Sequence, residues 1–264
     1  MPTAGLSATE AAELIKHSNG QVVDRMNEFT APTFRTRGGR KGAGMGLLLE
    51  GLWGYHMSAV LESHGIEISW IADDQYNDYA CTDMAEEWDP VTHEGELLRI
   101  EAKSMNLGAD ELKGHFAEIA ANIGPDDLLL VLVWRWAPCG DSTSRVWPKV
   151  VDAFVDRALP LARLRDELHV ARGGSFVERE SCPDGCEARL CQHHGEPLNA
   201  SGNRERLQGP TSRKPNSTSH GANFGGLKRM LATRGTSAAR RKQGICRADP
   251  VAREFVEFMT KAGG

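Results

Sequence analysis

The stretch Leu97-Leu98-Arg99-Ile100-Glu101-Ala102-Lys103 places a carboxylate and a lysine two positions apart in a largely apolar run. Side chains alternate between the two faces of a β-strand. Glu101 and Lys103 are therefore expected to lie side by side on one face, with Ile100 and Ala102 on the other. Burying two charged side chains costs free energy unless the protein uses both charges to bind a partner or to carry out chemistry. A divalent metal ion on Glu101 and an activated water near Lys103 would use both, as metal-dependent phosphodiester cleavage requires.

The residues around this stretch predict a mixed α/β fold. Helices are predicted at 7–28, 47–63, 109–122, 159–170 and 250–261, and strands at 66–72, within 79–88, at 97–104 and at 128–136, while 146–155 is a strand or a short helix. This order indicates a central mixed sheet flanked by helices. Two parts are expected: a core with the N-terminal helix and a basic loop at 1–175, and a Cys/His-rich and basic region at 176–264.

Charge is distributed unevenly along the 264 residues. Between Glu62 and Glu111 there are fourteen acids and two bases, whereas between Asn203 and Arg247 there are eleven bases and one acid. This asymmetry indicates a part that holds metal and a part that faces a polyanion. Residues 1–20 lack the apolar core of a signal peptide, no apolar run reaches the length of a membrane span, and the cysteines are clustered. We therefore expect a reduced, cytoplasmic protein with no membrane partner.

The chain resembles the PD-(D/E)xK nuclease superfamily, which includes many restriction endonucleases. The resemblance rests on Glu101-Ala102-Lys103 after an apolar strand start, an acid some twenty positions earlier, and Glu50 on the upstream helix. It covers about a third of the chain, residues 47–136. It implies a restriction-endonuclease-like sandwich and the Mg²⁺-dependent hydrolysis of double-stranded DNA that a restriction or defence nuclease carries out. Such an enzyme is expected to be a homodimer if it cuts both strands, because one site cuts one strand per encounter.

The acid that accompanies Glu101 depends on the register of the preceding hairpin. Two carboxylates can hold Mg²⁺, and a neighbouring lysine favours the hydroxide form of a bound water. If the turn centres near residues 92–93, Glu101 lies across from Met84, which makes Asp83 the neighbouring acid. Asp78, at the start of the next apolar run, is the alternative. Thr82-Asp83 stands where the family name has Pro-Asp.

Glu50 is the third acid that the resemblance assigns to the site. Many members of the superfamily add an acid from the first helix to the metal site, which implies a helping role for Glu50. The alternative is a solvent-exposed glutamate on an amphipathic helix, since Glu50 is offset from the Leu49, Leu52 and Trp53 face.

A second cluster of candidate ligands comprises Cys182, Cys186, Cys191 and His193, with His194 as the alternative fourth ligand. Thiolates and imidazoles are the donors that Zn²⁺ prefers in tetrahedral sites. The residues between the first two cysteines, Pro-Asp-Gly, favour the tight turn that a chelating loop needs. The sequence therefore predicts a zinc site. An alternative interpretation of 193–199 is an HNH nuclease finger.

Basic residues set among Gly, Ser, Thr and Asn predict contacts with the DNA backbone. The candidates are Arg37, Arg40 and Lys41 in the early loop, and Arg213, Lys214, Lys228, Arg229, Arg240, Arg241 and Lys242 near the C-terminus. The sequence thus predicts a Mg²⁺-dependent DNA endonuclease. The alternative is a non-enzymatic, zinc-containing DNA-binding regulator in which the acidic hairpin is only structural.

Overall fold

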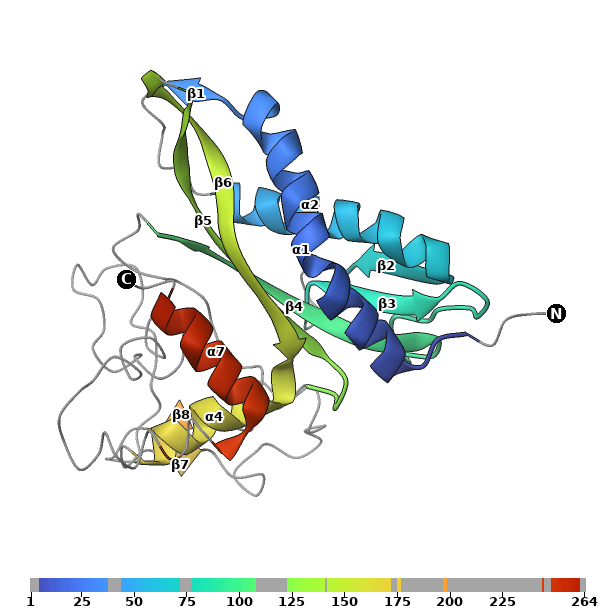
Figure 1. Ribbon diagram of the computed structural model, residues 1–264. Helices are drawn as coiled ribbons and strands as arrows, with labels where there is room; N and C mark the ends of the chain where they lie inside the picture. The colour runs from blue at the N-terminus through green and yellow to red at the C-terminus, as the bar shows by residue number, and fades with distance from the viewer. Residues whose placement is uncertain are drawn as a thin grey trace, which may run out of the picture. The chain divides into compact units, whose positions relative to one another are not determined.

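The computed structural model describes residues 5–37, 44–71, 77–107, 123–140, 142–171, 175–176, 197–198, 244 and 248–261. The chain forms two compact units, which are Met1–Asp110 with Gly124–Arg157, and Glu111–Ile123 with Ala158–Gly264. The candidate strand Leu97–Lys103 belongs to the first unit, so this unit is described first (Figure 1).

The first unit is a mixed α/β structure with one sheet of six strands. Its elements are α1 (Ala8–Thr33), β1 (Thr36–Arg37), α2 (Met45–Leu61), the 3₁₀ helix η1 (Glu62–His64), β2 (Ile66–Trp70), β3 (Tyr79–Asp83), β4 (Glu96–Asn106), β5 (Leu128–Cys139) and β6 (Ser142–Arg157). The strand order is β1-β6-β5-β4-β3-β2, and only β4 and β5 are parallel neighbours. The predicted α/β class with a central mixed sheet is confirmed.

Helix α1 begins where the sequence predicts, because Ser7 and Glu10 form a capping box. The Ser7 hydroxyl accepts from the Glu10 N–H at 3.3 Å, and the Glu10 carboxylate accepts from the Ser7 N–H at 2.9 Å. The helix continues past the predicted end at residue 28 to Thr33. Near the C-terminal end of α1, the Asn27 side chain hydrogen-bonds both the N–H and the C=O of Val150 in β6, which fixes α1 on the sheet.

Both helices of this unit pack on one face of the sheet. Ile100 and Ala102 are buried in the same core cluster as Trp53 of α2 and Ile15 of α1. Figure 1 shows α1 and α2 crossing the same side of the strands. Because side chains alternate along β4, Glu101 lies on the opposite face. The predicted separation of the two sets of side chains is confirmed.

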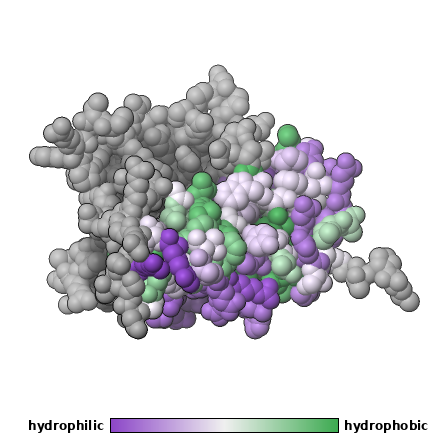
Figure 2. Space-filling model, turned by 90° about the horizontal axis from the view of Figure 1, so that it is seen from above, coloured by the Kyte–Doolittle hydropathy of each residue, from purple (hydrophilic) through white to green (hydrophobic). Residues whose placement is uncertain are grey.

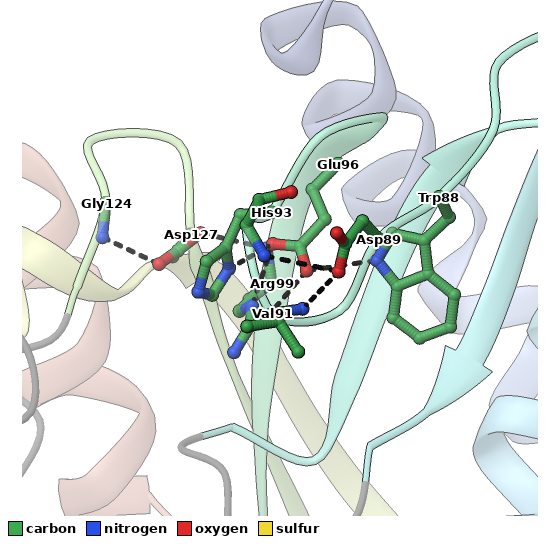
Figure 3. Close-up of polar contacts among 9 residues, drawn as sticks. Trp88, Asp89, Val91, His93, Glu96, Arg99, Gly124 and Asp127 are labelled. Atoms are coloured by element: carbon green, nitrogen blue, oxygen red, sulfur yellow. Dashed lines mark hydrogen bonds and ion pairs between the residues drawn. The ribbon is translucent and has the colours of Figure 1, made fainter.

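A cluster of polar side chains closes the hairpin between β3 and β4. Glu96 accepts hydrogen bonds from Arg99 (Nη2 at 2.7 Å and Nε at 2.9 Å), from the Trp88 indole at 3.1 Å, and contacts the His93 ring at 2.9 Å. The Asp127 carboxylate, just before β5, accepts from the Arg99 N–H at 2.8 Å (Figure 3). The side chains of Glu96 and Arg99 are only 8% and 6% exposed. This cluster fixes where the β3–β4 pairing begins.

Replacing Glu96 by Gln is expected to lower the free energy of unfolding by about 2–4 kcal/mol, because the buried Arg99 guanidinium loses its charged acceptor. Urea unfolding measures this change. The matched control is Glu94→Gln, an exposed glutamate in the same loop, for which a change below about 0.5 kcal/mol is expected. Equal losses in both variants would contradict a special role for Glu96.

The same cluster makes the free energy of unfolding depend on pH. Although burial opposes it, the hydrogen bonds from Arg99, His93 and Trp88 hold the pKa of Glu96 at about 2, below its ordinary value of 4.5. A carboxyl whose pKa is lowered by folding stabilises the fold above its unfolded pKa. This stabilisation is lost as the pH falls through 4.5 toward about 2.

In the second unit the structure describes two helices and a short strand pair. They are α4 (Ala158–Ala171), α7 (Pro250–Lys261), β7 (Ser175–Phe176) and β8 (Pro197–Leu198). Helices α4 and α7 pack together, and α7 buries Phe255, Phe258 and Met259. The Asp249 carboxylate caps α7 by accepting from the Val251 N–H at 2.8 Å. Both helices occupy the ranges predicted for them.

Several large apolar side chains are exposed on the described surface. Figure 2 shows one face of the molecule, on which hydrophobic residues stand between hydrophilic ones. Among the exposed apolar side chains are those of Leu47 and Tyr55 on α2. Within the described residues, no helix is both long enough and apolar enough to cross a membrane.

Candidate active site

Glu101 and Lys103 form an ion pair in the middle of β4. The Lys103 ammonium contacts the Glu101 carboxylate and also donates to the Ala102 carbonyl at 3.0 Å. The side chains of Glu101 and Lys103 are 11% and 20% exposed. The prediction that they lie side by side on one face is confirmed.

Asp78 is the acid that lies beside this pair. Its N–H donates to the Ile100 carbonyl at 3.0 Å, and its carboxylate accepts from the Ala102 N–H at 2.7 Å. The same Oδ2 atom is 3.9 Å from the Lys103 Nζ. The preceding residue, Asn77, has a φ of 75°, in the left-handed region that asparagine tolerates better than most residues. Asp78 therefore enters β3 directly beside the Glu101–Lys103 pair.

The expected register, with Met84 across from Glu101 and Asp83 as the neighbouring acid, is wrong. The observed register pairs Tyr79 with Ile100 and Thr82 with Glu96, with a β-bulge between these pairs. Asp83 is instead at the far end of β3, where its carboxylate accepts from the Ala85 N–H at 2.8 Å. The expectation failed because the connection turns nearer Asp89 than residues 92–93, and the polar cluster around Glu96 holds it there.

Glu50 joins the site from α2. The Glu50 carboxyl lies close enough to Ser104, which follows Lys103 in β4, for the side chain and backbone of Ser104 to lower its pKa. Gly46 of α2 lies close to β4, since a Cβ at this position would be 2.2 Å from the Ser104 hydroxyl and would require the Ser104 side chain to move. The Tyr79 hydroxyl also donates to the Glu50 carbonyl at 2.7 Å, so α2 is held to both strands.

Burial and mutual repulsion perturb these carboxyl groups. Burial raises the pKa of Glu101 to about 7, with Lys103 opposing the rise and Asp78 and Glu50 adding to it. Burial also raises the pKa of Glu50, and Asp78 contributes to the increase. Carboxyl groups in this state are poised to gain from a cation.

Lys103 remains charged at neutral pH. Burial alone would lower its pKa, but the charges of Glu101, Asp78 and Glu50 outweigh burial and raise the pKa above its ordinary value. Lys103 therefore supplies a fixed positive charge and is not suited to accept a proton. The charge of the Lys103 ammonium is opposed by those of three carboxyl groups, so the net charge of the four groups is negative when all three acids are ionised.

The donor set of this site fits Mg²⁺. This ion prefers oxygen ligands and is commonly held by one or two carboxylates, with water and substrate phosphates completing its coordination. Asp78 and Glu101 would supply those carboxylates. Among the described residues, no three His, Cys, Asp or Glu side chains are arranged as a ready metal-binding group, and Lys103 occupies the Glu101 carboxylate. Metal binding at this site therefore requires the Lys103 side chain to shift from Glu101.

Most of the other predicted binding residues lie outside the described residues. These are the zinc candidates Cys182, Cys186, Cys191 and His193, and the basic candidates Arg40, Lys41, Arg213, Lys214, Lys228, Arg229, Arg240, Arg241 and Lys242. Arg37 lies in β1 and is the register partner of Arg145 in β6. The described cysteines, Cys81 and Cys139, are both free.

Sequence reasoning did not find Ser104 and Gly46. Ser104 directly follows the Glu-Ala-Lys run, and a polar residue on the helix-facing side of an apolar strand is a signal that it has a specific partner. Gly46 gives no comparable signal in the sequence. Its role depends on the approach of α2 to β4, which no local pattern reveals.

Comparisons with known proteins give no assignment for this site. No protein-family model matches the chain, and no curated protein matches it in sequence.

Proposed function

We propose that the protein is a Mg²⁺-dependent DNA endonuclease of the PD-(D/E)xK type, acting in restriction or defence. The observation that carries the proposal is the convergence of Asp78, Glu101 and Lys103 at neighbouring positions of β3 and β4. Glu50 on α2 lies close enough for the charges of Asp78 and Lys103 to affect its pKa. Three antiparallel strands followed by a parallel β5 also agree with the restriction-endonuclease-like sandwich that the sequence resemblance implies. The motif is then Asn77-Asp78 followed by Glu101-Ala102-Lys103.

Each residue has a distinct role in this proposal. Asp78 and Glu101 hold the metal, and Glu50 adds negative charge from α2. When bound, Mg²⁺ would neutralise phosphate charge and lower the pKa of a bound water. The Lys103 ammonium stabilises the negative charge that develops as the water loses its proton and attacks phosphorus. Because its pKa is raised, Lys103 acts by its charge rather than as a base.

A plasmid assay tests the proposed function. Supercoiled DNA incubated with the protein and Mg²⁺ is expected to yield nicked and linear products, and EDTA is expected to prevent both, because the carboxylates alone cannot neutralise phosphate charge. Salt-sensitive DNA binding without cleavage, in Mg²⁺ and in Mn²⁺ alike, would contradict the proposal. That result would favour the zinc-containing regulator instead.

A further inference from the structure

The outer part of the β5–β6 pair is a basic ribbon that the proposed site does not use. Arg135 on β5 and Arg145 and Lys149 on β6 are exposed. Among the described residues, none of the three forms an ion pair with a carboxylate. Apart from Asp141, no acidic residue occurs between Arg135 and Val151. Figure 1 shows this part of the two strands continuing past α2 toward β1.

The three basic side chains lie on one face of the ribbon. Arg135 and Lys149 are direct register partners, so their side chains share a face. Arg145 lies where the β5–β6 register shifts, but it pairs regularly with Arg37 of β1 and is four positions from Lys149 in β6, so alternation puts it on that face as well. Trp147 lies between them in the same alternation. The ribbon face is therefore basic with one aromatic side chain.

The ribbon face is the sheet face that carries Glu101 and Lys103. Lys103 pairs with Val131 of β5, and Arg135 is two alternations further along the same strand. At about 3.3 Å per residue, Arg135 is roughly 13 Å beyond Lys103, and the Arg145 end of the ribbon is about 26 Å beyond it. The opposite face carries Trp134 and Val150, which belong to the core cluster beneath the helices.

This arrangement is unfavourable in the free protein. Like charges directly opposite each other in an antiparallel pair destabilise it, and Arg135 faces Lys149 in this way. A row of phosphates would remove the repulsion. A two-stranded ribbon has the right width for the major groove of DNA, and arginine side chains suit bidentate phosphate contacts. The Asn27 hydrogen bonds to Val150 anchor the base of the ribbon, so the ribbon is held before DNA arrives.

We propose that Arg135, Arg145 and Lys149 form a DNA-binding ribbon that grips duplex backbone on one side of the scissile phosphate. At about 3.4 Å per base pair, the contacts fall roughly four to eight base pairs from the cut. The substrate is then a duplex polymer rather than a small phosphodiester. This inference rests on the proposed function for the position of the cut, but the ribbon's affinity for DNA is measurable without cleavage.

The experiment compares two triple variants with equal changes in net charge. The first is Arg135→Gln, Arg145→Gln and Lys149→Gln. The control is Arg25→Gln, Arg163→Gln and Arg253→Gln, three exposed arginines on α1, α4 and α7. Binding of a duplex of about 30 base pairs is measured in Ca²⁺ over a series of salt concentrations, because each lost phosphate contact lowers the salt slope by about 0.9.

The ribbon variant is expected to lose about tenfold or more in affinity, and its salt slope should fall by about 2–3, whereas the control should change neither by much. Hydrolysis of bis(4-nitrophenyl) phosphate with Mg²⁺ should be equal in wild type and ribbon variant. Unchanged DNA binding in the ribbon variant, or an equal loss in the control, would overturn the inference. If the ribbon triple variant fails to fold, as judged by thermal unfolding, Arg135→Gln and Lys149→Gln are measured singly against Arg25→Gln.

The two proposals fail separately in this design. If the wild-type protein hydrolyses neither bis(4-nitrophenyl) phosphate nor plasmid DNA, the proposed nuclease activity is wrong. The binding comparison would still test whether the ribbon binds DNA. If the wild-type protein cleaves DNA but the ribbon variant keeps the full DNA affinity and salt slope, the DNA-binding role of the ribbon is wrong. The proposed nuclease activity would then stand.

Discussion

Replacing Lys103 by Met is expected to reduce Mg²⁺-dependent DNA cleavage by about 10³-fold, since a positioned charge in a partly buried site commonly contributes this much. DNA binding should persist because the basic ribbon is untouched. The reason for the loss is local: the Lys103 ammonium is bonded to Glu101 and lies 3.9 Å from the Asp78 carboxylate. No other basic side chain of the described residues is paired with either acid.

The same variant has a second signature in its pH dependence. Lys103 lowers the pKa of Glu101, which burial has raised to about 7. Without the ammonium, the pKa of Glu101 rises further. A carboxyl group must be ionised to bind metal, so Mg²⁺ binding in Lys103→Met should require a higher pH than in the wild type. Calorimetric titration with Mg²⁺ at several pH values measures this shift.

Lys16→Met provides the matched control. Lys16 also pairs with a buried carboxylate, that of Asp156, but it lies on α1. We expect Lys16→Met to lose stability while keeping cleavage within about threefold of the wild type. Equal cleavage by Lys103→Met and wild type would end the proposed role of Lys103. A fall in cleavage with no change in the pH dependence of metal binding would contradict its coupling to Glu101.

Local pattern predicted most of the described elements of this fold, whereas the helix predicted at 109–122 lies outside the described residues. The strand predicted at 97–104 is β4, which has one further residue at its N-terminal end and two at its C-terminal end, and the helix predicted at 250–261 has those bounds in the structure. Both carry strong hydrophobic periodicity, which reports which face is buried. Residues 146–155 were open between strand and helix. Only pairing along the whole of β5 decides that they form β6, and pairing is a long-range property.

The sequence predicted which site residues share a face of one strand, but not which residue of the neighbouring strand lies beside them. Glu101 and Lys103 share a face because alternation within β4 demands it. The partner acid depends on the connection from Met84 to Gly95, whose turn is fixed by contacts of Glu96 with Arg99, His93 and Trp88. These contacts join residues only three to eight positions apart, but they form only in the folded hairpin. One bulge is enough to change the residue that lies opposite.

The basic ribbon shows a signal that was present in the sequence and was not used. The run at 128–136 reads as the most apolar of the chain, so Arg135 near its end was not singled out. Its meaning appears only when the register places Lys149 opposite, because like charges then meet on one face. A count of charged residues along the sequence does not reveal this pairing of like charges. It becomes visible only when the residues that lie opposite each other on the two strands are known.

Asp78 and Asp83, the two candidate metal-binding acids, can be compared directly by making the same substitution at each. Asp78→Asn is expected to reduce cleavage by about 10²-fold or more, because one of two metal-binding carboxylates is lost. Asp83→Asn, the same change in the same strand region, should leave cleavage within about threefold. Both are measured as single-turnover cleavage of plasmid DNA with saturating Mg²⁺, and by the affinity for Mg²⁺ in calorimetry.

The structure explains why these near-identical substitutions should differ. The Asp78 carboxylate accepts from the Ala102 N–H at 2.7 Å, an interaction that an asparagine oxygen can retain, so the fold should survive the loss of charge. The Asp83 carboxylate serves a turn, where it accepts from the Ala85 N–H, and it has no contact with Glu101 or Lys103. Loss of cleavage in Asp83→Asn, with Asp78→Asn active, would mean that the β3–β4 register differs in the active protein. Equal activity in both would mean that neither acid holds the metal.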